Sequence, residues 1–264
     1  MDASLLAAGN VRVEVDGAVM TVTLDRAEAR NAQTPATWAA LVHVGRELTP
    51  DVRVVILRGA GPTFSAGLDR RMFTPDGIPG EPSLLSLAAA SDDEIDAQIS
   101  AYQDAFTWWR ASDAITIAAV QGHAIGAGFQ LALGCDLIVA DETALFSMKE
   151  PSFGLVPDLA GTAPLVEAVG YSRALEICTS SRSVGAEEAL RIGLVVAVAA
   201  AGEINGVLAS LIAPIVANPA GSVTATKHLL RGAAHRHPVD QRAAERDAQR
   251  DRLRELAALA GFGS

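Results

Sequence analysis

The sequence contains little cysteine and no long apolar run, and each absence excludes a class of protein. Only two of its 264 residues are cysteines, Cys135 and Cys178, and neither belongs to a CxxC or HExxH pattern. We therefore expect two reduced, buried thiols, no disulfide framework and no metal site. The longest apolar run, residues 194–201, is far too short to cross a bilayer.

Basic residues are also scarce. The chain carries 21 Lys and Arg against 31 Asp and Glu, for a formal net charge of -10, and its only lysines are Lys149 and Lys227. This charge argues against a nucleic-acid partner, whose phosphates require a basic face. The N-terminus lacks a basic stretch followed by an apolar block, so we expect no secretory signal and predict a cytoplasmic protein without a membrane partner.

Apolar residues make up 50% of the chain, enough to bury a sizeable core. Two runs of alternating polarity flank Asp16-Gly17 and predict an N-terminal β-hairpin. Buried-strand patterns at 52–57, 115–120 and 137–140 alternate with helical patterns, which predicts parallel crossovers and an α/β fold. We expect residues 1–200 to form this core and residues 201–264 to form a C-terminal helical region.

Two glycine-bearing loops each follow a predicted buried strand. They are FSAGLD at residues 64–69 and GHAIGAG at residues 122–128, the second leading directly into a helix. Glycines at such junctions let backbone N–H groups point into a cavity, and two converging N–H groups form an oxyanion hole. The dinucleotide, phosphate-loop and hydrolase-elbow patterns GxGxxG, GxxxxGK[ST] and GxSxG are absent. Residues 74–90, rich in Pro, Gly and Ser, are the best candidate for a mobile loop over the pocket.

Four collinear motifs resemble the enoyl-CoA hydratase/isomerase (crotonase) superfamily, from about residue 11 to 198. They are the segment containing LDR and RNA at residues 24–32, the two glycine loops, and FSMKEPSFGLVPD at residues 146–158. The resemblance implies a spiral of β-β-α units and C-terminal helices used in assembly, usually as a homotrimer or homohexamer. It also implies an acyl-CoA thioester substrate, with no cofactor besides the coenzyme A that the substrate carries.

The resemblance also assigns binding roles. The oxyanion donors would be the backbone N–H groups of Ala66 and Ala127, and Arg26 could contact a CoA phosphate. The remaining substrate-binding positions would be Ser65, Gly67, Leu68, Asp69 and Gly126.

The family's hydratases carry two glutamates that activate a water, and the matching positions here are Gln130 and Glu150. An amide has no titratable proton, so Gln130 cannot act as acid or base, although it could orient a water or substrate. Glu150 alone suffices to move a double bond, and Asp158 lies where dienoyl-CoA isomerases hold a second carboxylate. Asp158 could equally be a turn residue after Pro157. The motifs favour an isomerase; the alternatives are a hydratase with one carboxylate and a non-catalytic acyl-CoA binder.

Overall fold

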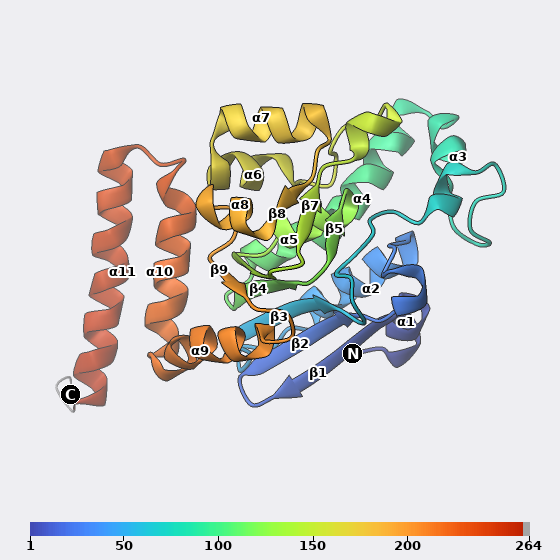
Figure 1. Cartoon of the computed structure of the whole chain (residues 1–264). Helices are drawn as coiled ribbons and strands as arrows, with labels where there is room; N and C mark the ends of the chain where they lie inside the picture. Colours follow the sequence, from blue (N-terminus) through green and yellow to red (C-terminus); the bar gives the residue numbers. More distant parts are fainter. Residues whose placement is uncertain (261–264) are drawn as a thin grey trace.

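The computed structural model describes residues 1–260, which form a twisted sheet covered by helices and continued by a C-terminal helical hairpin (Figure 1). The main sheet has the strand order β1-β2-β3-β4-β6-β9, in which only the β1–β2 pair is antiparallel. Its strands are β1 (Val11–Asp16), β2 (Val19–Leu24), β3 (Val54–Gly59), β4 (Ile115–Val120), β6 (Leu137–Asp141) and β9 (Ala197–Ala199). The predicted hairpin and the predicted parallel α/β core are both confirmed.

A second, three-stranded sheet was not predicted from the sequence. It consists of β5 (His123–Ile125), β7 (Leu145–Ser147) and β8 (Val184–Gly185) in the order β5-β7-β8. Strands of two or three residues are too short for an alternating pattern to be recognised. The short strand β5 lies inside the second glycine loop, and it therefore helps to position the site.

The helices begin where the local sequence provides a cap. Thr34 and Thr37 form a reciprocal capping box at the start of α2, with Pro35 as the first helical residue. Ser91 and Glu94 cap the 20-residue helix α4 in the same way. The helices are α1 (Ala3–Ala8), α2 (Pro35–Arg46), α3 (Leu84–Ala88), α4 (Asp92–Ala111), α5 (Ala127–Leu133), α6 (Thr162–Val169), α7 (Tyr171–Ser180), α8 (Ala186–Arg191), α9 (Ile204–Ala217), α10 (Ala220–Ala233) and α11 (Pro238–Leu259), with 3-10 turns η1 (Ala27–Ala29), η2 (Arg70–Phe73) and η3 (Glu150–Phe153).

Two apolar clusters cover the two faces of the main sheet. The larger one packs α2, α4 and α5 against one face, where Trp38, Phe106 and Trp109 are buried. On the other face Ile204, Leu208 and Ile212 of α9 pack against the sheet. Helix α9 is thus a layer of the core, and the C-terminal region that protrudes in Figure 1 consists of α10 and α11.

Helix α10 is attached to the core by a buried lysine. The ammonium of Lys227, which is 7% exposed, bonds Asp136 Oδ2 at 2.7 Å and the carbonyl oxygen of Ala114 at 2.6 Å. The same carboxylate oxygen accepts bonds from the N–H and hydroxyl of Thr116. This network gives Lys227 a structural role, which the sequence alone did not assign.

Helix α11 packs on α10 and exposes Leu253, Leu256 and Leu259. Assembly through this region stays a prediction, and its last residues, 261–264, lie outside the described part of the chain. Among residues 1–260, no single helix is long and apolar enough to span a membrane. Helices α9 and α10 meet those criteria only as a pair, across a bend of 108°.

Candidate active site

Backbone hydrogen bonds join the two glycine loops side by side. Phe64 N–H donates to the Gln121 carbonyl and Ser65 N–H to the His123 carbonyl, both at 2.8 Å, and Ile125 N–H returns to the Ser65 carbonyl at 3.0 Å. Glycine is required for this approach, because a Cβ added at Gly67 would lie 2.4 Å from the Ile125 carbonyl oxygen. The loops that the sequence singled out are therefore one structural unit.

Two backbone N–H groups at this junction are available to a ligand. Ala127 is the first residue of α5, where N–H groups have no partner within the helix. A short bridge pairs Gln33 with Leu68 through the bonds Gln33 N–H to the Gly67 carbonyl and Asp69 N–H to the Gln33 carbonyl. Because N–H directions alternate along extended chain, the Leu68 N–H points away from that bridge. A Cβ at Gly67 would lie 3.6 Å from the Ala127 nitrogen, so the residue before Leu68 lies close to the Ala127 N–H.

The structure corrects two predicted roles in the first loop. The Ala66 N–H donates to the Arg30 carbonyl at 2.9 Å, so it is not free to hold a substrate oxygen. The Ser65 hydroxyl is fully buried and donates to the Asn31 carbonyl at 2.8 Å. It also accepts bonds from the Gln33 amide and the Gly67 N–H, which makes Ser65 a support of the loop and not a substrate contact. The motif alone could not show which N–H of FSAGL is already used.

Gln130 and Glu150 lie together, as the motifs predicted. The Gln130 amide nitrogen donates to Glu150 Oε1 at 2.7 Å. The other carboxylate oxygen, Oε2, is buried and has no hydrogen-bond partner among residues 1–260. Gly126 packs against this carboxylate, since a Cβ there would lie 3.1 Å from Oε1. Within the described part of the chain, Glu150 Oε2 is thus the carboxylate oxygen without a hydrogen bond, and it lies beside the loop that carries the Ala127 N–H.

Burial raises the pKa of Glu150, and the negative charge of Asp158 adds to that increase, while the Gln130 hydrogen bond opposes it. Burial also raises the pKa of Asp158. A carboxyl group with a raised pKa is better suited to accept and return a proton near neutral pH. Asp158 therefore contributes to the electrostatic surroundings of Glu150, and its role as a second acid/base stays a prediction.

A basic cavity of about 750 Å³ adjoins the first loop. The guanidinium of Arg26, only 14% exposed, pairs with the carboxylate of Asp69, which also binds Arg71 at 2.9 Å. Arg26 is thus already bound within the protein and is less available to a phosphate than predicted. The hydrogen bonds from Arg71 and Arg26 keep the pKa of the Asp69 carboxyl well below its usual range. The cavity is lined by Asn10, Arg26, Glu28, Ala29, Arg30, Ala32, Ala66, Leu68, Asp69, Arg70 and Arg71.

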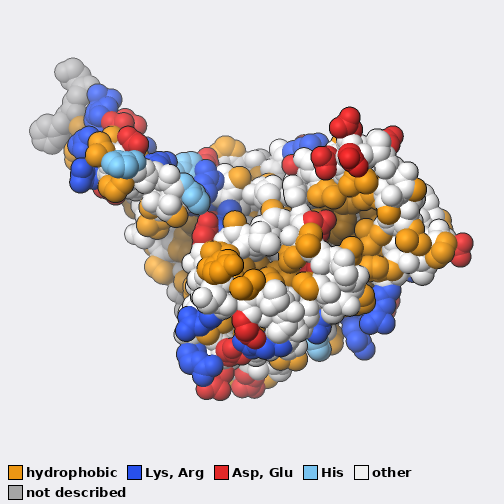
Figure 2. Space-filling view, turned by 90° about the horizontal axis from the view of Figure 1, so that it is seen from above, with side chains coloured by type: hydrophobic (Ala, Val, Ile, Leu, Met, Phe, Trp, Pro, Cys, Tyr) orange, Lys and Arg blue, Asp and Glu red, His pale blue; other side chains and the backbone are white. Residues whose placement is uncertain are grey.

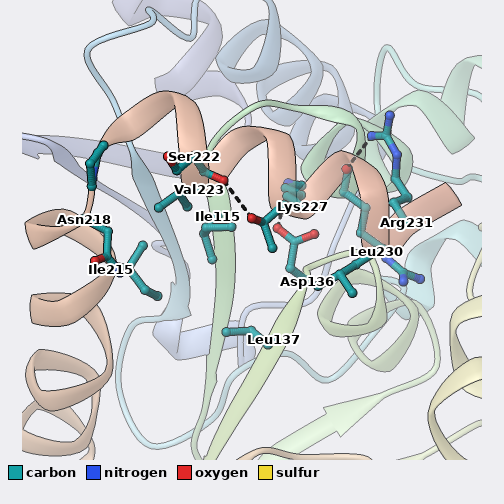
Figure 3. Close-up of a pocket in the computed structure, with 13 residues that line it drawn as sticks. Ile115, Asp136, Leu137, Ile215, Asn218, Ser222, Val223, Lys227, Leu230 and Arg231 are labelled. Carbon is teal, nitrogen blue, oxygen red and sulfur yellow. Dashed lines mark hydrogen bonds and ion pairs between the residues drawn. The ribbon is translucent and has the colours of Figure 1, made fainter. Parts of the chain in front are cut away.

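A second cavity, of about 580 Å³, lies between α10 and the main sheet (Figure 3). Its charged side chains are bound within the protein: Lys227 donates to the Asp136 carboxylate, and Arg231 donates to the backbone carbonyl of Arg110. It holds none of the predicted site residues. We therefore place the active site at the glycine loops.

Hydrophobic side chains gather around a hollow on the face seen from above (Figure 2). Phe153, Leu155 and Val156, in and just after the 3-10 turn η3, are exposed. The ring of Phe73 lies 5.5 Å from that of Phe153. Exposed apolar side chains therefore follow Glu150 closely along the chain.

The geometry matches a known family. The family model described as enoyl-CoA hydratase/isomerase matches residues 14–258. The chain belongs to this family. The predicted superfamily and its α/β fold are confirmed, whereas a special likeness to isomerase-type members stays a prediction.

Relatives in this family are named for hydratases. A Mycobacterium tuberculosis protein named as the enoyl-CoA hydratase echA8 is 32% identical over 190 residues, or 70% of this chain. The match spans 66% of that relative's length, slightly under two thirds. The (E)-benzylidenesuccinyl-CoA hydratase of Thauera aromatica is 32% identical over 199 residues, covering 70% of this chain and 68% of its own. A Thermobifida fusca structure described as an enoyl-CoA hydratase with acetoacetyl-CoA has 44% identity and a TM-score of 0.91, covering 96% of this chain and 98% of that one.

Proposed function

We propose that this enzyme moves a double bond within an enoyl-CoA or dienoyl-CoA thioester, with Glu150 as its acid/base. The observation that carries the proposal is the Gln130–Glu150 pair: one carboxylate stands where two are needed to hold and activate a water. A glutamine can donate and accept hydrogen bonds but cannot exchange a proton at working pH. Support for a CoA thioester as substrate comes from the acetoacetyl-CoA bound to the Thermobifida fusca neighbour.

In the proposed reaction, the thioester oxygen accepts hydrogen bonds from the N–H groups of Leu68 and Ala127. Glu150 Oε2 removes a proton from C2 of a 3-enoyl thioester, and the electrons move to the thioester oxygen as a dienolate. The two N–H groups stabilise that charge. The protonated Glu150 then delivers its proton to C4, which yields the 2-enoyl thioester and restores the carboxylate.

The competing function is hydration of a 2-enoyl thioester with Glu150 alone, and the names of the relatives favour it. Parallel assays with 3-enoyl-CoA, a dienoyl-CoA and 2-enoyl-CoA separate the two functions. We expect migration to be faster than hydration. Hydration that exceeds migration would contradict the proposal, and tight binding without either reaction would indicate an acyl-CoA binder.

The arginine-lined cavity is the proposed site for the phosphates of CoA. Exposed Arg30 and Arg70 are its best candidates, because Arg26 and Arg71 already bind Asp69. We expect Arg30→Ala and Arg70→Ala each to weaken CoA binding roughly tenfold at low salt, the effect of losing a hydrogen bond to a charged group. High salt should reduce the difference.

Calorimetry with CoA and with an acyl-pantetheine lacking the nucleotide is the measurement. The arginine variants should weaken binding of CoA only. Arg46→Ala, an exposed arginine at the end of α2, is the control for the change in net charge. Equal losses for both ligands would show that the arginines support the fold of the loop and do not bind phosphate.

A further inference from the structure

The Gln130 amide connects three parts of the active site. Its nitrogen donates to Glu150 Oε1, and its oxygen accepts the backbone N–H groups of Leu159 at 2.9 Å and Gly161 at 3.3 Å. The amide cannot be turned round, because its NH₂ group would then face two backbone donors. The direction of every hydrogen bond in this chain of contacts is therefore defined.

The surrounding residues hold this amide in place. Gln130 lies within α5 and is 1% exposed. A Cβ at Gly161 would lie 2.7 Å from Gln130 Cγ, so only glycine allows the segment after Asp158 to approach so closely. The same segment is bound from α4, where the Gln103 amide donates to the Asp158 carbonyl oxygen at 2.6 Å.

We infer that Gln130 is a positioning residue whose amide holds Glu150 by Oε1, so that Oε2 alone exchanges protons with the substrate. The inference rests on the proposed function and explains why an amide stands at this position. A glutamine donates to the carboxylate and favours its ionised form, whereas an ionised glutamate could only accept and would repel it. Gln130 therefore has a role of its own at this position: its N–H donor favours the ionised form of Glu150, the single buried base of the site.

Two substitutions separate the donor role from the support of the backbone. Gln130→Glu keeps an acceptor for the Leu159 and Gly161 N–H groups but loses the donor to Glu150. Gln130→Met removes both interactions at nearly the same volume. Gln103→Met is the matched control, because Gln103 binds the same segment and does not contact Glu150.

The pH profile of double-bond migration is the first readout. Glu150 must be ionised to remove a proton, so activity rises with pH through its pKa. Loss of the Gln130 donor raises that pKa and should shift the acidic limb of the profile to higher pH in both Gln130 variants. At the wild-type optimum we expect kcat to fall on the order of tenfold, with little change in KM. Gln103→Met should leave the limb unchanged.

Infrared titration of the Glu150 carboxyl, obtained as the difference between each protein and its Glu150→Gln counterpart, gives the same pKa without turnover. Asp158 and Cys178, the other titratable groups near Glu150, are unchanged in all variants, and Gln130→Met gives the titration free of the second carboxyl that Gln130→Glu introduces. A titration that both Gln130 variants leave unchanged, or that Gln103→Met shifts equally, overturns the inference. If the shift is present but the wild type only hydrates, the proposed function fails and the positioning role stands.

Discussion

Replacing Glu150 with glutamine should reduce double-bond migration by about 10²–10⁴-fold, the usual cost of removing a general acid/base. Glu150 is the member of the Gln130–Glu150 pair that can exchange a proton, and its buried Oε2 has no hydrogen-bond partner among residues 1–260. Binding should survive, because the Leu68 and Ala127 donors belong to the backbone. Migration rates together with calorimetry on acetoacetyl-CoA test both statements.

Glu142→Gln is the control for this substitution, since Glu142 is an exposed glutamate of the same domain. Its rate should equal that of the wild type. Glu150→Gln activity within a few-fold of wild type would show that another group carries the proton. Loss of binding together with activity would instead assign Glu150 a structural role.

Replacing Gly67 with alanine should cost about 10²–10³-fold in turnover, the typical effect of losing one oxyanion donor. The new methyl group would lie 2.4 Å from the Ile125 carbonyl oxygen, so the two loops must separate. That separation would move the Leu68 N–H away from the Ala127 N–H. Turnover and melting temperature are measured on the same preparation.

Gly202→Ala is the matched control because it changes backbone strain without a clash. Gly202 has φ 83°, close to the 86° of Gly67, and nothing lies within 4 Å of its added Cβ. Both variants should lose stability through the left-handed φ, but only Gly67→Ala should lose turnover. Normal turnover in Gly67→Ala would remove Leu68 from the proposed oxyanion hole.

The sequence by itself determined the local features of this protein. The Asp16-Gly17 turn, the cap at Thr34-Pro35 and the strand–glycine–helix order are set by neighbouring residues, and each was found where predicted. The motifs also identified the family and paired Gln130 with Glu150. Such features are readable because turn, cap and pattern preferences act over a few residues.

Contacts between distant segments were decided only by the tertiary structure. A sequence cannot show that the Ala66 N–H is taken by Arg30 or that Asp69 engages Arg26, because each bond joins residues more than 30 positions apart. The same holds for α9, which the sequence assigned to a C-terminal helical region but whose apolar residues pack against the main sheet. Hydrogen-bond satisfaction and burial are settled by packing, and packing decided which N–H groups and which carboxylate oxygen remain free for chemistry.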